Sequence, residues 1–234
     1  MKNYQRGILA VSVLLIAISA NIKAQESEVV EEEVSSPFTV GADLVSSYVW
    51  RGVKFGGPAL QPMVEFSKSG FTLGAWGSFG IGPVDEAVNE ADLYVSYGFD
   101  FGLSIGLSDY YYQGAPYFEY GDSISSHALE INVGYEIKNL SISANYILNN
   151  STYGAGSVGG DMYFELAYAF KNFNFFIGAG DGWHTSTNNF EVCNIGISAS
   201  KELKISDKFS LPVSGLVSIN PQLETLNIVG TITF

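Results

Sequence analysis

Charged and aromatic side chains recur at every second position of segments whose other side is apolar. The residues that share the polar side are Asp43, Arg51, Gln61, Glu65, Trp76, Asp92, Tyr94, Glu130, Asp161, Tyr163 and Glu165. They include six acids and one arginine. Carboxylates that face a common space favour cations over anions. Alternatively, these groups pair with one another across a filled interior, with Arg51 as a shared counter-ion.

A second pattern is the triplet His184-Thr185-Ser186. On an extended strand, positions i and i+2 share a face, so an imidazole there could act as the base for a serine hydroxyl. Asn188, Asn189 or Glu191 could then orient the ring. The spacing resembles that of outer-membrane phospholipases and lipid A deacylases. Because the triplet falls in an expected loop, and a triad is recognised by geometry, we predict no enzyme and no catalytic residue.

Metal and thiol chemistry have little support in the sequence. His127 has no obvious partner, and two histidines are too few for a convincing metal site without carboxylate help. Cys193 is the single cysteine, so no intramolecular disulfide can form. We therefore expect no metal site and no cofactor, and we interpret Cys193 as a small, packed or lipid-facing residue.

The first residues predict export. Lys2 and Arg6 precede an apolar run over residues 8–20, and cleavage is expected after Ala24. The run is shorter than the roughly 20 residues of a spanning helix. Removing residues 1–24 takes three bases and no acid, which leaves 8 bases, 24 acids and a formal charge of −16. Such a charge argues against nucleic-acid binding.

Residues 25–37 contain five glutamates and no base. A segment this acidic, with little to bury, predicts a flexible periplasmic tail. From Phe38 onward the composition changes to Gly, Tyr, Phe, Ser and alternating aliphatic residues. The chain therefore divides into a signal peptide (1–24), an acidic tail (25–37) and a third region (38–234).

The third region alternates apolar and polar residues with a period of two. The pattern is clearest over residues 140–149, 161–170 and 224–234. Alternation over about ten residues is typical of a barrel wall between lipid and water. We expect strands at 38–51, 59–67, 71–79, 90–99, 101–111, 126–137, 140–149, 161–170, 173–180, 190–202, 208–219 and 224–234. The fold class is thus all-β, a transmembrane antiparallel up-and-down β-barrel of about twelve strands.

Connection lengths give an independent check of this assignment. Starting from a periplasmic N-terminus, every second connection should be short. The short ones are residues 68–70, 100, 138–139, 171–172 and 203–207. The longer ones are 52–58, 80–89, 112–125, 150–160 and 181–189, all rich in Gly, Asn, Asp and Ser. This alternation fits short turns on the periplasmic side and long loops on the external side. The last connection, residues 220–223, is short although it should be an external loop, so it does not help to decide.

Aromatic residues fall in two rows, as expected at the two lipid–water boundaries. The inner row is Phe38, Phe66, Phe71, Phe99, Phe101, Phe170, Phe173, Phe209 and Phe234. The outer row is Trp50, Phe79, Tyr111, Phe118, Trp183 and Phe190. The terminal Phe234 resembles the signal that the outer-membrane assembly machinery reads. A soluble β-sandwich, the competing fold, has strands of five or six residues and predicts no such rows.

Several short motifs resemble the TorF-type porin family. They are Ser46-Ser47-Tyr48-Val49-Trp50-Arg51-Gly52, Pro58-Ala59-Leu60-Gln61-Pro62, Gly74-Ala75-Trp76-Gly77-Ser78, Glu90-Ala91-Asp92-Leu93-Tyr94 and Tyr117-Phe118-Glu119-Tyr120. The resemblance covers residues 38–136, and the remainder follows only the strand rhythm. Gln61-Pro62, where the family more often has Gln-Gly, and the acidic tail depart from its pattern. The resemblance implies an outer-membrane barrel with no demonstrated substrate.

These observations together predict a porin in the outer membrane of a Gram-negative bacterium. It would let small hydrophilic solutes diffuse passively, with a weak preference for cations. Its expected partners are outer-membrane lipids, the β-barrel assembly machinery and small solutes; the oligomeric state stays open. The alternatives are a lipid hydrolase that uses the His-x-Ser pair, or a closed structural or adhesive barrel acting through its tyrosine-rich loop 112–125. A barrel of twelve strands is intermediate in size between small barrels, which side chains fill, and large barrels, which enclose open channels.

Overall fold

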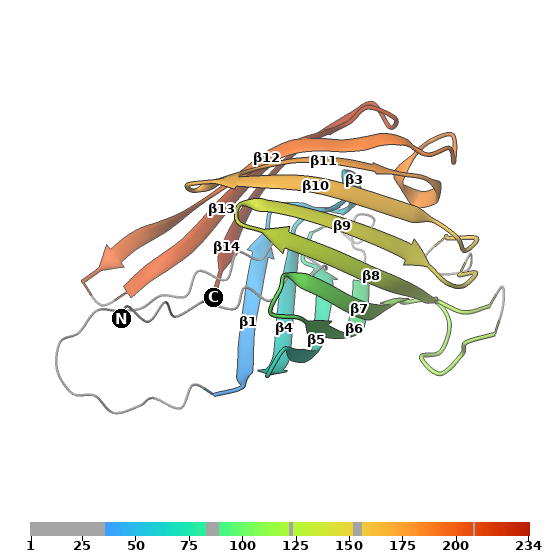
Figure 1. The fold of residues 1–234 in the computed structure, drawn as a ribbon, viewed down its shortest axis with the longest axis horizontal. Coiled ribbons are helices and arrows are strands. Elements are labelled where there is room, and N and C mark those ends of the chain that lie inside the picture. Colours follow the sequence, from blue (N-terminus) through green and yellow to red (C-terminus); the bar gives the residue numbers. More distant parts are fainter. Residues whose placement is uncertain (1–35, 83–88, 122–123, 152–155, 208) are drawn as a thin grey trace.

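A computed structural model describes residues 36–82, 89–121, 124–151, 156–207 and 209–234. Its wall is a closed antiparallel barrel of twelve strands, as predicted (Figure 1). These are β1 (Phe38–Val45), β4 (Ala59–Lys68), β5 (Phe71–Gly80), β6 (Asn89–Gly98), β7 (Leu103–Tyr112), β8 (His127–Ile137), β9 (Leu140–Ile147), β10 (Met162–Phe170), β11 (Phe173–Gly180), β12 (Glu191–Ser206), β13 (Phe209–Asn220) and β14 (Thr225–Thr233). The expected signal peptide and nearly all of the acidic tail lie outside the described residues.

The connectivity is up-and-down. Each wall strand pairs with its neighbours in the chain, and β1 closes the ring by pairing with β4 on one side and β14 on the other. The β1–β14 seam is short, with register partners only from Asp43↔Thr233 to Val45↔Thr231. Main-chain hydrogen bonds between Ala42 and Phe234, and between Ser46 and Gly230, extend it at both ends.

One end of the barrel, the turn end, carries the tight connections. Ser69 and Gly70 both have positive φ, and Lys138 and Lys171 each begin a two-residue connection with positive φ. Two-residue hairpins favour such left-handed residues because their twist matches that of the strands. The longer connections lie at the opposite end, the loop end. The expected alternation of short and long connections is therefore confirmed where the connections are described.

The outer surface of the wall is apolar. In β14, for example, Leu226 and Ile228 are 63% and 69% exposed, whereas the intervening Asn227 and Val229 are buried. Similar exposure recurs around the ring, at Leu73, Leu93, Ile131, Phe164 and Ile177 among others. A closed wall that is apolar outside and polar inside is the arrangement of a membrane-spanning barrel. Among the described residues, no helix is long and apolar enough to cross a membrane.

The first strand differs from its prediction. We expected it to run over residues 38–51, but β1 ends at Val45, and residues 46–58 form a hairpin of β2 (Tyr48–Trp50) and β3 (Val53–Gly56). The chain leaves the wall at Ser46, whose Oγ accepts the Gly230 N–H at 2.9 Å. Arg51 and Gly52 then reverse its direction with φ of 47° and 83°. We call residues 46–58 the plug hairpin, because they occupy the lumen.

Two further expectations need correction. Trp50 and Trp183 belong to the interior and not to an outer row, since Trp50 packs on Trp183 with ring centroids 5.7 Å apart and both contact His184. Strand β12 extends to Ser206, although residues 203–207 were expected to form a turn. Register pairs with β13 continue to Ser206↔Phe209, so the extra residues lengthen the wall at the turn end.

Candidate functional site

The lumen has two unlike halves. Small hydroxyl side chains, most of them half-buried, line the half near the turn end. We call this half the hydroxyl vestibule; its residues are Ser67, Thr72, Ser96, Ser104, Ser141, Ser143, Ser200, Ser214 and Thr231. The half near the loop end is filled by the plug hairpin and by buried aromatic and charged side chains. Water therefore reaches the vestibule more freely than the filled half.

An ion pair fixes the tip of the plug hairpin to the opposite wall. Arg51 donates two hydrogen bonds to the Glu130 carboxylate, at 2.7 and 2.9 Å. Glu130 also accepts hydrogen bonds from the Tyr110 hydroxyl at 2.8 Å and from the Asn132 amide at 2.6 Å. Burial alone would lower the pKa of Arg51, but the Glu130 carboxylate raises it above its usual value. The guanidinium is therefore always charged and strongly held.

Two aromatic rings lie within cation–π distance of this guanidinium. The Arg51 Cζ lies 4.2 Å from the ring centroid of Trp50 and 4.7 Å from that of Tyr163. Tyr163 donates to Glu165 at 2.5 Å and receives the Asn194 amide at 3.0 Å. Its ring lies over Gly178 on β11, where a methyl group would overlap it. One connected network thus joins the hairpin to β7, β8, β10, β11 and β12.

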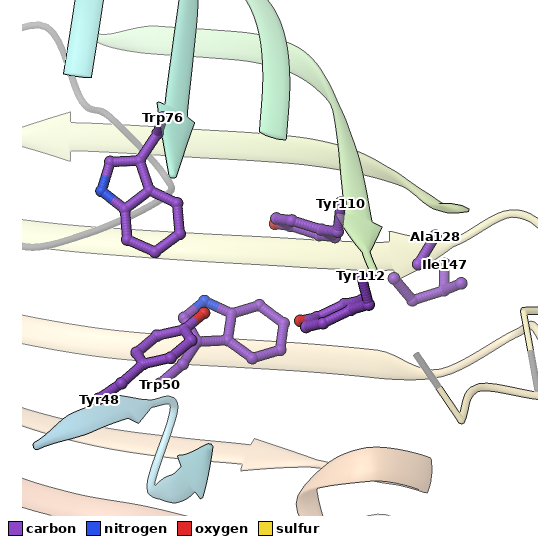
Figure 2. Close-up of a cluster of buried hydrophobic side chains, with 7 residues drawn as sticks. All are labelled: Tyr48, Trp50, Trp76, Tyr110, Tyr112, Ala128 and Ile147. Carbon is purple, nitrogen blue, oxygen red and sulfur yellow. The ribbon is translucent and has the colours of Figure 1, made fainter. Parts of the chain in front are cut away.

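A layer of aromatic rings lies next to the ion pair. Figure 2 shows Tyr48 and Trp50 from the hairpin converging with Trp76 of β5 and with Tyr110 and Tyr112 of β7. The Tyr48 and Trp76 centroids are 5.7 Å apart, and those of Trp50 and Tyr110 are 5.5 Å apart. Offset and edge-on contacts at such distances are favourable for aromatic pairs. The layer fills part of the loop-end half of the lumen.

Two carboxylates on β6 lie among these rings. Glu90 and Asp92 are two positions apart on the inward face and are 1% and 2% exposed. The Tyr48 hydroxyl donates to Glu90 at 2.6 Å. The Asp92 carboxyl group interacts with that of Glu90 and with the backbone of Tyr111. Sequence reasoning named Asp92 and missed Glu90, although their spacing of two places both on one face.

The predicted inward residues divide into groups. Arg51, Glu130, Tyr163 and Glu165 meet in the network described above. Glu65 accepts the Tyr94 hydroxyl at 3.0 Å, nearer the turn end. Asp43, Gln61 and Asp161 lie apart from these: Asp43 accepts from Thr233, Gln61 donates to Ser78, and Asp161 precedes β10. Trp76 and Asp92 are register partners on β5 and β6.

The His-x-Ser triplet does not form a pair. The His184 ring is buried between Trp50 and Tyr163, with centroids 5.4 and 4.9 Å away. Ser186 is on the exposed side, and its hydroxyl donates to the Gln222 carbonyl at 3.0 Å. Burial lowers the pKa of His184 well below its usual value, and the Arg51 guanidinium lowers it further. The neutral imidazole is part of the filled lumen.

The other histidine anchors the tyrosine-rich loop. His127 Nδ1 lies 2.8 Å from Asp109 Oδ1, and Nε2 lies 2.5 Å from the Tyr117 carbonyl oxygen. Tyr120 stacks on the ring with centroids 4.1 Å apart. Phe118, at the surface of this loop, is 87% exposed. Sequence reasoning found no partner for His127 because Asp109 and Tyr117 are distant in the chain and meet it only across β7 and the loop.

Within the described ranges, no group of three or more His, Cys, Asp or Glu side chains is arranged to hold a metal ion. Cys193 is a free, buried thiol at an irregularity in the β11–β12 pairing.

Comparisons with known proteins give a family and a set of distant structures. No curated protein matches the chain by sequence. Among solved structures, a mutant of the Rhodopseudomonas blastica porin is similar at 14% identity, covering 85% of this chain and 74% of that one, with a TM-score of 0.44. A structure described as "Asymmetric conductivity of engineered proteins" is similar at 12% identity, covering 85% and 73%, with a TM-score of 0.42. A model described as "Bacterial protein of unknown function (Gcw_chp)" matches residues 31–209, well over half of the sequence, and the chain therefore belongs to the Gcw_chp family.

Proposed function

We propose that this protein is an outer-membrane channel for small hydrophilic solutes, as its resemblance to TorF-type porins implies, and that the plug hairpin narrows it. The observation that carries the proposal is the arrangement of the lumen. A water-accessible hydroxyl vestibule leads to a segment that crosses the lumen but is not part of the wall. A barrel built only for structure has no need of a polar vestibule beneath a separate insert.

The hairpin can move without breaking the wall. Strand β2 pairs only with β3, in a two-stranded sheet separate from the barrel. Its tip is held by the Arg51–Glu130 pair and by the Asn227 amide, which donates to the Gly52 carbonyl at 3.0 Å. Displacing the tip would therefore break side-chain contacts, but it would leave the main-chain hydrogen bonds between the wall strands intact. That separation suits a constriction whose width changes.

The charges support a weak cation preference. Apart from Arg51, whose charge Glu130 balances, the predicted inward charged residues are acids. Of these, Glu65 accepts a hydrogen bond from the vestibule residue Ser67, and Asp43 accepts one from Thr233. Carboxylates along a narrow aqueous path raise the local concentration of cations. We expect them to set the sign of the selectivity.

Conductance tests this function directly. The folded chain is reconstituted in planar bilayers beside a variant in which residues 47–57 are replaced by a short Gly-Ser linker. The parent should give small stepwise conductances, and the shortened variant should give conductances at least several-fold larger. A folded, heat-modifiable shortened barrel that conducts no ions would overturn the channel.

We also propose the location and assembly route that the sequence suggests. The turn end would face the periplasm, the loop end the exterior, and the apolar belt the lipids. Phe234 at the turn end would serve the assembly machinery. Deleting Phe234 should lower the amount of heat-modifiable barrel in the outer membrane. An undiminished yield would remove that role.

One alternative has a specific observation in its favour. Phe118 and Tyr120 are exposed on a loop that His127 holds in place. This arrangement suits an adhesive surface better than a loosely attached loop would. Binding of the purified protein to whole cells or surface polymers that Phe118→Ser abolishes, with conductance unchanged, would assign adhesion to this loop. The hydrolase alternative would require His184 and Ser186 to meet, and their present contacts hold them apart.

A further inference from the structure

An acid and a histidine lie on the outward, apolar side of the wall near the loop end. Asp109 on β7 continues the outward alternation of Ile105 and Leu107, which are 47% and 40% exposed. On β8, His127 shares its side of the strand with Ile131, which is also 40% exposed. Ionisable side chains on the lipid-facing side of a barrel are destabilising when they meet hydrocarbon. This pair is therefore stable there only if something covers it.

The tyrosine-rich loop is the cover. Tyr120 stacks on the His127 ring with centroids 4.1 Å apart, and its hydroxyl donates to Asp109 at 3.4 Å. The Tyr117 carbonyl oxygen lies 2.5 Å from His127 Nε2. As a result, the His127 side chain is 0% exposed and that of Asp109 is 17% exposed. The described part of the loop, residues 113–121, thus packs on the outer side of β7 and β8, away from the lumen.

The covered pair lies at the edge of the apolar belt. The register partners of Asp109 are Leu93 on β6 and Leu129 on β8, and Leu93 is 48% exposed on the outer surface. A strand rises about 3.4 Å per residue, so Asp109 lies only about 7 Å along β7 from the exposed Leu107. The loop therefore begins where the belt ends, and its outer side continues the surface of the belt.

That outer side is aromatic. The Phe118 ring is 87% exposed, and Tyr120 is 50% exposed although its ring stacks on His127. Tyrosine and other aromatic side chains are enriched where a membrane meets water, because the ring is apolar and a hydroxyl keeps its contact with water. An exposed phenylalanine beside an exposed tyrosine, level with the end of an apolar belt, has the chemistry of that boundary.

We propose that residues 113–121, held on the outer wall by Asp109 and His127, form a lipid-binding surface for the membrane leaflet at the loop end. The Phe118 ring lies among the acyl chains just below the headgroups, and the Tyr120 hydroxyl lies at headgroup level. This contact is additional to the proposed channel. It requires only that the barrel sits in a bilayer, so a barrel that conducts no ions would make the same contact.

Quenching by brominated lipid provides the measurement. The three native tryptophans lie in the lumen, so the parent protein gives the background emission. Phe118→Trp is reconstituted in phosphatidylcholine vesicles whose acyl chains carry bromine near the headgroup, and in vesicles without bromine. Bromine should quench the added emission at least about twofold, because a side chain at the boundary touches the upper part of the acyl chains.

A matched control is Ser186→Trp, at an exposed position of another loop-end connection, in which His184 packs inside the lumen. Its added emission should be quenched much less. Quenching of Phe118→Trp that is no larger than that of this control would overturn the lipid contact. If aqueous iodide quenches Phe118→Trp while bromine does not, the ring faces water, and the adhesive alternative gains in its place.

A second variant tests what holds the loop. Adding His127→Gln to Phe118→Trp removes the ring on which Tyr120 stacks, so bromine quenching should fall toward that of the control. Heat-modifiable migration shows that each variant is folded, and Asp109→Asn serves if His127→Gln does not fold. Undiminished quenching in the folded double variant would overturn the part that the proposal gives to this pair.

Discussion

The Arg51 guanidinium and the Glu130 carboxylate are joined by two hydrogen bonds across the lumen, although 79 residues separate them in the sequence. Arg51 comes from a hairpin that leaves the wall after β1, and Glu130 from β8. Both side chains are almost fully buried, at 7% and 2% exposure. The first connection of the barrel is thereby tied to its far wall.

Breaking this pair from one side should be costly. Arg51→Met leaves the Glu130 charge buried without its partner, and we expect a loss of about 3–5 kcal/mol in the free energy of unfolding. The double variant with Glu130→Gln should recover much of that loss, because neither charge then remains. Urea unfolding in detergent, followed by tryptophan fluorescence, measures all three. Lys204→Gln, at an exposed pair, should have little effect; an equally small effect of Arg51→Met would contradict the expectation.

Neutralising the vestibule carboxylates should weaken selectivity. In Asp43→Asn with Glu65→Gln, the reversal potential under a salt gradient should move toward zero, because fewer fixed anions face the path. Asp207→Asn, whose charge is almost fully exposed at the turn end, is the matched control and should leave the potential unchanged. If the reversal potential of the double variant equals that of the control, these two acids do not determine the ion selectivity.

Acid should destabilise the filled lumen through His184. Its pKa is lowered in the folded protein, whereas the unfolded chain titrates near its ordinary value of about 6.5. Below that pH the unfolded state binds more protons, so stability falls by up to about 1.4 kcal/mol per pH unit until the folded pKa is reached. His184→Gln removes this contribution, so the difference between parent and variant should shrink at low pH. Parallel pH profiles would contradict this sign.

Crowding Gly178 should disturb the ion-pair network from the wall. A methyl group there overlaps the Tyr163 ring, which also covers Arg51. Overpacking of this kind costs about 1–3 kcal/mol, so Gly178→Ala should lower the free energy of unfolding by that amount. Gly215→Ala is the comparison, since the nearest atom to its added methyl is 4.0 Å away. Equal stability of the two variants would show that the ring moves aside freely.

The wall was predictable because its pattern is local. Alternation such as Leu226, Asn227, Ile228 and Val229 reports directly which side faces lipid. Short turns were visible for the same reason, at Lys138-Asn139 and Lys171-Asn172. Twelve strands and their order follow from these local signals, and the structure confirms them.

The filling of the lumen was not predictable in the same way. Tyr48-Val49-Trp50 continues the alternation of β1, so period two does not reveal that the chain has left the wall. Gly52 was the available signal in the sequence, because glycine adopts the positive φ of a tight reversal at no steric cost, and its φ is 83° in the structure. Arg51 pairs with Glu130 on β8, 79 residues away in the sequence. Closure of the barrel brings the two together, so no residue near Arg51 in the sequence indicates this partner.

The position of the plug hairpin has a consequence for biogenesis. It lies between β1 and β4, which pair directly, yet its tip contacts β8 through Glu130 and β14 through Asn227. Strand β14 is also the one that seals the ring against β1. Pairing of β14 with β1 therefore closes the barrel and also supplies the last contact of the plug hairpin. A hairpin that had not yet entered the lumen at that step would have to enter a barrel that is already closed. Substitutions that loosen the hairpin should therefore delay maturation of the barrel, as well as weaken the finished molecule.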